Sequence, residues 1–531
     1  MPTTLNIADL QKAWANRDPR FTKLLVDCSV QDDPGLEPPP RDGAPTFDEW
    51  IRFLRSGELR RKTKPEQAAA RVERLKVVEA ADAEVPLAER RKIDTVILEL
   101  WNANGALARD TLLQVIADVP LMYGPWRALK RIFKEAEAKN DTEVYGALAA
   151  RFDSACSSSR CGEISAATLA YLARRAWRYL RRVAVQLPAT YPDVAVDLLS
   201  RYTEDAVWPR TWIWNHIAFH ETKKYGRSGF RFDSRSQPKP SELKHRAYGD
   251  LWKRSPRPLF ALLELARAET VREFAIAGLK TDFKPVLRDV EPAWVQRLAG
   301  VPSAAVHEFM VWILQNVPKF EQAAFRKLGL HDAVLRLFDS PSGAARKYAA
   351  EYARIHARDL TLDQLVKLAN NGDAAVQKLV LDLLGERDPR KEIGLDGWGR
   401  LLETTHMNEF AAKSLLKSFG AKELTPAWFA ERLLHGSRAA GAFAQTNLLK
   451  LHPAKGLGPV YFVELLKKID LKNDAHSALA QWVMGELKLL DLPAIPQADL
   501  QWLALFPFTA AAVDGWISES KITSQAFGID F

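Results

Sequence analysis

Apolar residues recur through most of this chain at intervals of three and four, which is the spacing of one face of an α-helix. Residues 93–101 illustrate the pattern, with apolar side chains at Ile93, Val96, Ile97, Leu100 and Trp101. The helical pattern is nearly continuous from Glu66 onward, and no segment convincingly alternates apolar and polar residues as a strand would. The sequence therefore predicts an all-α fold.

The first 65 residues do not follow this pattern throughout. We expect residues 1–65 to form an irregular N-terminal segment and residues 66–222 to form an N-terminal helical region. The stretch 32–45 contains five prolines and two glycines, and proline has no backbone N–H to donate within a helix. This stretch is therefore predicted to be a surface loop that follows a short helix.

The C-terminal half contains a series of similar segments, each with the end of a helix, a short polar turn and a second helix. A leucine precedes each turn, at Leu265, Leu298, Leu337, Leu368, Leu402, Leu434 and Leu466. Successive leucines are 33, 39, 31, 34, 32 and 32 residues apart, a drifting period that is typical of repeats built from helical hairpins. We therefore predict that residues 258–531 form a HEAT-like α-solenoid. The alternative is a globular all-α domain of unrelated amphipathic helices.

The composition narrows the class of protein. Of the 531 residues, 47% are hydrophobic and 27% are charged, which is the balance of a folded chain and not of a disordered one. No run of 18 apolar residues predicts a transmembrane helix, and the N-terminus lacks the pattern of a signal peptide. Three cysteines do not suggest a disulfide framework. We expect a cytoplasmic protein with no membrane partner.

The net charge of +9 is concentrated in one part of the chain. Residues 171–260 contain 18 Lys and Arg against 8 Asp and Glu, whereas residues 1–170 are close to neutral and residues 261–531 are neutral. A local surplus of this size indicates a surface for an anionic partner.

The strongest candidate for such a surface is the predicted helix 169–183. At about 100° per residue, five arginines lie within one arc of this helix together with Tyr171, and apolar residues lie opposite. The arginines are Arg174, Arg175, Arg178, Arg181 and Arg182. Guanidinium groups bind phosphates through two parallel hydrogen bonds, so the arc favours an anion-binding face. The alternative is that carboxylates of a neighbouring helix pair with these arginines.

A second basic stretch, residues 223–257, has 11 Lys and Arg against three acidic residues. We expect a long loop insertion whose basic side chains contact a phosphate backbone and whose aromatic rings stack on unpaired bases. The basic candidates are Lys223, Lys224, Arg227, Arg231, Arg235, Lys244, Arg246, Lys253 and Arg254. The aromatic residues between them are Tyr225, Phe230, Phe232, Tyr248 and Trp252. The alternatives are a solvated loop, or a loop whose aromatic residues dock on the helices.

Two smaller groups could carry chemistry but favour structural interpretations. His216 and His220 have the i, i+4 spacing of metal ligands, but Glu221 would point about 100° away from His220 on a helix, so we favour hydrogen-bonded histidines in an aromatic core. Cys156 and Cys161 are interpreted as incidental thiols. No phosphate-binding loop, nucleophile elbow or kinase motif is present. The sequence predicts no catalytic residue, metal, cofactor or small-molecule substrate.

Several segments occur in an order that suggests a family. They are RALKRIFKEAEAKNDTEVYGALAARFD (127–153), YLARRAWRYLRR (171–182), the Trp-x-Trp-Asn-His-Ile run (212–217) and Leu-Trp (251–252). Together they resemble the helical-repeat region of bacterial proteins that combine HEAT-like repeats with an N-terminal WGR domain. The resemblance implies nucleic-acid association through the WGR domain, which is not recognisable in this chain. That implication therefore rests on the basic stretch.

These observations lead to one preferred hypothesis and two alternatives. The preferred hypothesis is a non-catalytic α-solenoid scaffold that binds nucleic acid, with DNA favoured over RNA, through its central basic region and a protein partner through its repeats. The first alternative is a protein-only adaptor that docks an acidic subunit. The second is a HEAT-like DNA glycosylase, for which Asp233 or Asp250 would supply the acid and Trp212 or Trp214 the aromatic contact.

Overall fold

The computed structural model describes residues 5–31, 52–54, 57–83, 89–222, 231–233, 235–470, 474–490, 492–506, 508–519 and 521–527. Within these ranges every regular element is a helix, which confirms the predicted all-α fold. Contacts between residues divide the chain into two compact units, Met1–Lys319 and Phe320–Phe531. The boundaries predicted at residues 65, 222 and 257 stay predictions. No described helix is both long and apolar enough to span a membrane.

The first unit contains most of the longer helices. Its α-helices are α1 (Ile7–Ala15), α2 (Phe21–Val30), α4 (Lys64–Ala83), α5 (Glu89–Ala103), α6 (Ala106–Asp118), α7 (Tyr123–Lys139), α8 (Thr142–Ser158), α9 (Ala166–Gln186), α10 (Tyr191–Leu199), α11 (Trp212–Phe219), α12 (Gly249–Trp252), α13 (Arg257–Leu265), α14 (Glu269–Asp282), α15 (Lys284–Leu287), α16 (Pro292–Leu298) and α17 (Ala304–Asn316). Its short 3₁₀ helices are η1 (Glu58–Arg61), η2 (Trp208–Arg210) and η3 (Leu243–His245).

Helix α8 lies at the centre of this unit and packs against α6, α7, α9 and α10. Most of its side chains are buried, and the ring of Tyr145 stacks on Phe133 of α7 with centroids 4.6 Å apart. At Gly146 a Cβ atom would lie only 2.8 Å from the carbonyl oxygen of Asp197 on α10, so glycine is needed for the two backbones to approach this closely. The core of the unit therefore forms around α8.

The start of the chain differs from the irregular segment expected from the sequence, because α1 and α2 lie within it. The Asn6 side chain accepts a hydrogen bond from the Asp9 backbone N–H, and the Asp9 carboxylate accepts one from the Asn6 backbone N–H. These two reciprocal bonds form a capping box at the N-terminus of α1. Phe21 and Leu25 of α2 are buried, and both helices pack on α5. The proline-rich stretch 32–45 lies outside the described residues.

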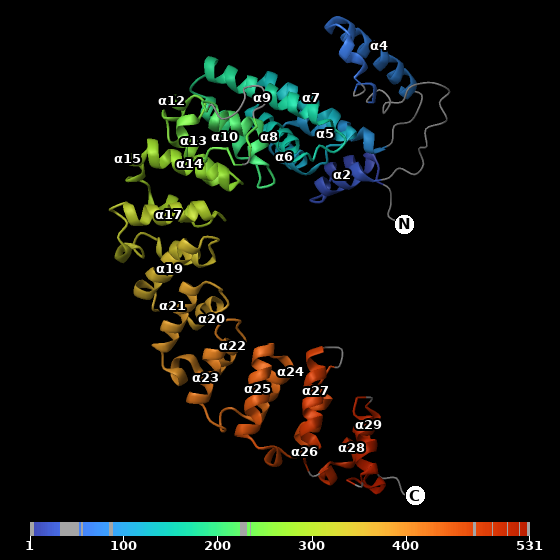
Figure 1. Ribbon diagram of the computed structural model, residues 1–531, viewed down its shortest axis with the longest axis vertical. Helices are drawn as coiled ribbons and strands as arrows, with labels where there is room; N and C mark the ends of the chain where they lie inside the picture. Colours follow the sequence, from blue (N-terminus) through green and yellow to red (C-terminus); the bar gives the residue numbers. More distant parts are fainter. Residues whose placement is uncertain are drawn as a thin grey trace. The chain divides into compact units, whose positions relative to one another are not determined.

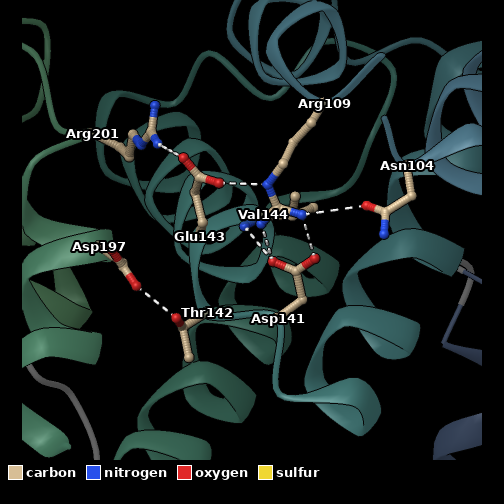
Figure 2. Close-up of polar contacts among 8 residues, drawn as sticks. All are labelled: Asn104, Arg109, Asp141, Thr142, Glu143, Val144, Asp197 and Arg201. Atoms are coloured by element: carbon tan, nitrogen blue, oxygen red, sulfur yellow. Dashed lines mark hydrogen bonds and ion pairs between the residues drawn. The ribbon is translucent and has the colours of Figure 1, made fainter. Parts of the chain in front are cut away.

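An ion-pair network joins the first turn of α8 to its neighbours (Figure 2). Arg109 of α6 donates two hydrogen bonds of 2.6 and 2.8 Å to the Asp141 carboxylate, and its Nε donates one of 2.6 Å to Glu143. Arg201 binds the other oxygen of Glu143 at 3.1 Å. Because Asp141 also accepts from the Val144 backbone N–H, it caps α8 and binds α6 at the same time.

The second unit is a series of helical pairs (Figure 1). Its α-helices are α18 (His331–Arg336), α19 (Gly343–His356), α20 (Leu362–Leu368), α21 (Ala374–Gly385), α22 (Gly394–Leu402), α23 (Asn408–Ser418), α24 (Pro426–His435), α25 (Arg438–Leu451), α26 (Ala454–Lys467), α27 (Asp474–Leu487), α28 (Gln497–Leu505) and α29 (Ala510–Ser518). Its shorter elements are η4 (Gln322–Ala324), η5 (Leu337–Asp339), the π-helix η6 (Pro389–Ile393), η7 (Leu492–Ala494) and η8 (Ser524–Phe527).

The leucines that precede the predicted turns lie at or beside helix ends. Leu298, Leu368 and Leu402 are the last residues of α16, α20 and α22, and each is followed by a short turn and a second helix. Leu434 and Leu466 are each one residue before the end of α24 and α26. The predicted hairpins are therefore present in both units.

Hydrogen bonds link the turns of consecutive hairpins within each unit. In the first unit, Glu269 accepts from the Ser303 hydroxyl and the Ala304 N–H, 34 and 35 residues away. In the second unit, the Asn371 side chain donates to the Phe338 carbonyl, 33 residues away, and Glu403 accepts from the Ser437 N–H, 34 residues away. The separations match the period of the leucines.

Candidate nucleic-acid interface

Helix α9 carries the arginine arc predicted from the sequence. The Ser165 side chain caps its N-terminus by accepting from the Thr168 N–H, and the helix ends at Gln186, two residues before Pro188. Leu172, Ala176, Leu180 and Val183 are buried, and the arginines lie on the other side. The predicted amphipathic helix is confirmed.

The five arginines of this arc fall into two groups. Arg175 donates from Nε to Glu137 of α7 at 2.6 Å, and Arg182 lies 3.8 Å from the other oxygen of the same carboxylate. Arg174, Arg178 and Arg181 are exposed and form no ion pair with any described residue. The charge of the arc is therefore only partly neutralised by its own chain. The Glu137 carboxylate pairs with two of the arginines, and the other three remain available to bind an external anion.

Aromatic rings, and not carboxylates, lie under two of the available arginines. The Arg174 guanidinium lies over the Trp212 ring at 5.1 Å from its centroid, and that of Arg178 lies over Tyr171 at 5.8 Å. A ring face attracts a cation through its quadrupole and does not cancel the charge. Both guanidinium groups are thus positioned while keeping their full charge for an external anion. We call Tyr171, Arg174, Arg178 and Arg181 the α9 surface.

A pocket of about 200 Å³ opens within the α9 surface. Its lining residues are Tyr171, Arg174, Trp177, Arg178 and His216. The Trp177 indole and the His216 imidazole stack with centroids 4.4 Å apart and planes 7° apart. The pocket therefore combines aromatic walls with two guanidinium groups.

The imidazole of His216 is uncharged at neutral pH. Burial, together with the neighbouring His220 and Arg181, lowers the pKa of His216 to about 2. The His216 and His220 Nδ1 atoms are 3.3 Å apart, so one nitrogen donates and the other accepts. In the described part of the chain, no group of three or more His, Cys, Asp or Glu side chains is arranged to hold a metal ion.

Helix α7 contributes two lysines that the sequence did not indicate. Lys130 and Lys134 are exposed and one turn apart on α7, and Lys130 lies close enough to Tyr171 for the two to interact electrostatically. Partial burial lowers the pKa of Lys130, and the positive charge of Lys134 lowers it further. The two lysines therefore extend the positive surface from α9 onto α7.

The second basic stretch is folded against the helices and does not form a free loop over its described part. Phe232 and Trp252 are buried, so their rings are not available to stack on bases, and the Phe232 N–H donates to the Pro209 carbonyl at 2.8 Å. Tyr248 is half-buried and contacts Trp177 and Tyr191. Tyr225 and Phe230 lie outside the described residues.

The described basic residues of this stretch differ in exposure and in their partners. Arg246 is buried and donates to the Asp282 carboxylate at 2.6 Å, so the prediction that places Arg246 on the interface is not supported by its position. Lys253 lies 3.5 Å from Asp250. Arg231, Arg235, Lys244 and Arg254 are exposed, and Lys223, Lys224 and Arg227 lie outside the described residues. Among the described residues, no hydrogen bond or ion pair joins Arg231, Arg235, Lys244 or Arg254 to the α9 surface.

The residues named for a glycosylase are likewise not gathered at one place. Trp214 is fully buried, and Trp212 is buried beneath Arg174. The Asp250 side chain is 97% exposed. The Asp250 carboxylate instead lies 3.5 Å from the Lys253 ammonium, and neither tryptophan ring is exposed beside it.

Sequence reasoning missed Trp177 as a lining residue. Its one signal is position, because Trp177 directly precedes Arg178 and so borders the arginine arc. The face it shares with His216 depends on how α9 packs against α11, which no local pattern reveals. The site therefore rests on its geometry. Comparison with protein-family models, with curated proteins and with solved structures finds no match to this chain.

Proposed function

We propose that this protein is a non-catalytic helical scaffold that binds nucleic acid through the α9 surface. The observation that carries the proposal is that Arg174, Arg178 and Arg181 are exposed on one face of one helix without an ion pair to any described residue. Like charges held close together repel one another. A polyanion with regularly spaced charges relieves that repulsion, whereas water and dilute salt only screen it.

The spacing of these arginines suits a phosphate backbone. Residues 174 to 181 span about 10 Å along a helix that rises 1.5 Å per residue, so the three guanidinium groups reach more than one phosphate of a strand. Phosphate contacts carry little sequence information. We therefore expect binding with weak sequence preference and a steep dependence on salt. DNA is the first ligand to test and RNA the second.

We further propose that the hairpins of residues 258–531 are HEAT-like repeats of an α-solenoid whose exposed faces hold a protein partner. The hydrogen bonds between turns, spaced 33–35 residues apart within each unit, support a repeated interface between neighbouring hairpins. Residues 261–531 carry no net charge, which suits a protein partner better than a nucleic acid. This assignment is independent of the α9 surface.

The test of nucleic-acid binding is charge reversal on α9. Arg174, Arg178 and Arg181 are changed together to Glu, and the affinity for a labelled oligonucleotide is measured between about 50 and 200 mM salt. In a plot of log affinity against log salt concentration, each phosphate contact contributes about 0.9 unit to the slope. The slope should become shallower by about 2 to 3 units. Circular dichroism checks that the variant is folded.

A matched control carries the same change of charge elsewhere. Arg267, Arg288 and Arg336 are exposed and also lack an ion pair among the described residues. Their joint change to Glu should reduce affinity far less than the α9 variant does. Equal affinities and equal slopes for the two variants would overturn the proposal, because only the net charge would then matter.

The competing hypothesis is an adaptor that docks an acidic protein on the same arginines. The two hypotheses differ in their response to nuclease. If the α9 variant binds oligonucleotides as the native protein does, but loses a partner that the native protein retains after nuclease treatment, the α9 surface serves a protein and our proposal is wrong.

A further inference from the structure

The pocket in the α9 surface has a chemistry that phosphate contacts alone do not use. Trp177 and His216, which stack on each other, form its buried aromatic lining, Tyr171 lines it with 46% of its surface exposed, and Arg174 and Arg178 complete the lining. Hydrated anions gain nothing from ring faces, since a recess walled by aromatic rings removes water without replacing its hydrogen bonds. The recess is therefore suited to a flat apolar group attached to an anion.

The size of the pocket limits what can enter. Its volume of about 200 Å³ is below the range of about 300–1,000 Å³ in which drug-sized ligands bind, so it accommodates one ring system and not two stacked ones. The buried His216 ring is neutral at neutral pH, so the charge of the pocket lining comes from Arg174 and Arg178.

A nucleotide offers both required parts, a planar base and an adjacent phosphate. In a duplex the base faces are covered by stacking and only the edges are reachable through the grooves. In a single strand the faces are free and stack readily on aromatic side chains. The recess can therefore accept a base only from an unpaired nucleotide.

We propose that this pocket receives the base of one unpaired nucleotide, with its flanking phosphates bound by Arg174 and Arg178. The inference deepens the proposed function and rests on it, because it assigns single-stranded nucleic acid as the ligand class of the α9 surface. Tyr171 stacks on the base from the exposed side. Arg181, which does not line the pocket, contacts the continuing backbone.

The test separates base stacking from phosphate binding. Tyr171→Ala removes the exposed ring, and Tyr171→Phe is the matched control that keeps it; Tyr171 is exposed, so neither change disturbs the core. Affinity is measured for a single-stranded oligonucleotide, for an abasic strand of the same length and for the duplex. Stacking of one base on an aromatic side chain changes affinity by about 5-fold or more.

We expect the native protein and Tyr171→Phe to bind the single strand at least about 5-fold more tightly than the abasic strand. Tyr171→Ala should lose that preference and bind the normal and abasic strands with equal affinity. Equal affinity of the native protein for normal and abasic strands would overturn the inference and leave phosphate binding intact. If no strand binds at all, the proposed function itself fails, so the two failures are distinguishable.

A fluorescent base provides a second readout in the same complexes. A strand carrying 2-aminopurine loses emission when that base stacks on an aromatic ring. Binding to the native protein should quench it, and binding to Tyr171→Ala should quench it less at saturation. Equal quenching at saturation by both proteins would place the base elsewhere and contradict the assignment of this pocket.

Discussion

The Trp177 indole lies face to face with the His216 imidazole, with ring centroids 4.4 Å apart and planes 7° apart. Trp177 comes from α9 and His216 from α11, so the stack joins the helix that carries the arginines to the aromatic core behind it. The aromatic walls of the pocket therefore depend on the contact between these two helices.

The buried His216 should make stability depend on pH. Its pKa is lowered from 6.5 to about 2 by burial, by His220 and by Arg181, so below about pH 6.5 the unfolded chain takes up a proton that the folded chain does not. The free energy of unfolding of the native protein should then fall, relative to His216→Phe, by about 1.4 kcal/mol per pH unit as pH decreases. Urea unfolding of both proteins between about pH 4.5 and 7.5 measures this difference. If the free energy of unfolding depended on pH in the same way for both, the prediction would be contradicted.

Asp153 should have the opposite effect in an overlapping range. Burial raises its pKa from 3.8 to about 6, although it accepts hydrogen bonds from Tyr202 and from the backbone N–H groups of Trp212 and Ile213. Between about pH 4 and 6 the folded chain keeps a proton that the unfolded chain has lost. Stability due to this group is therefore greatest below pH 4 and falls by about 3 kcal/mol as pH rises to 6.

This prediction is tested against Asp153→Asn, which cannot titrate. The difference in the free energy of unfolding between the native protein and the variant should shrink as pH rises from 4 to 6 and stay constant above about 7. A difference that grows with pH would show that the hydrogen bonds outweigh burial. The variant is required because the contributions of His216 and Asp153 oppose each other in the native protein.

The two lysines of α7 should strengthen nucleic-acid binding. Lys130→Gln with Lys134→Gln removes two charges of α7, one of them near Tyr171, and the salt dependence of binding should become shallower by about 1 to 2 units. Lys284→Gln with Lys327→Gln is the control, since both lysines are exposed and distant in sequence from α9. If the two double variants have the same slope, α7 is not part of the interface.

Arg109 should contribute more to stability than the arginines of α7, because it binds both Asp141 and Glu143 at the start of α8 (Figure 2). Arg109→Met should destabilise the protein by about 2 kcal/mol, between the values for exposed and buried ion pairs. Arg127→Met is the control, because Arg127 is mostly exposed and lies 3.3 Å from Asp94; its cost should be below about 1 kcal/mol. Thermal unfolding ranks the two.

Glu269 should stabilise the start of α17, to which it links the preceding hairpin. Glu269→Ala leaves the Ala304 N–H without its acceptor, and loss of a cap costs about 1 kcal/mol. Hydrogen exchange at the first turn of α17 should become faster. Glu291→Ala, at an N-cap whose side chain makes no capping hydrogen bond, should leave exchange in α17 unchanged. Equal rates of hydrogen exchange in α17 for both variants would show that Glu269 does not stabilise the start of this helix.

The helices and their ends could be predicted because they depend on neighbours within a few positions. The apolar period places Leu172 and Ala176 on the buried face of α9 and the arginines on the other, and the turns after Leu298 and Leu368 follow directly from the end of each period. The sequence indicated one short helix before the proline-rich stretch, whereas the structure has two, α1 and α2. Their signal was a short capping box at Asn6 and Asp9 followed by brief apolar faces, and the proline-rich stretch beside them dominated the interpretation.

Which cations remain available was not predictable. Arg174 and Arg175 are adjacent and chemically identical, yet Arg175 meets Glu137, 38 residues earlier, while Arg174 meets the Trp212 ring. Arg246 looked like its basic neighbours and is instead paired with Asp282, 36 residues later. These partners come from other helices, and nothing near the arginines in the chain distinguishes them.

The features that the sequence predicts and those that only the tertiary structure decides differ in how far apart in the chain the interacting residues lie. A helical period and its polar face arise from side chains a few residues apart, so a short segment of the sequence is enough to predict them. An ion pair or an aromatic pocket needs side chains from separate helices, and these meet only when the apolar faces are buried against one another. The arginine arc of α9 belongs to the first kind. Its partial neutralisation by Glu137 and the pocket lined by Trp177 and His216 belong to the second.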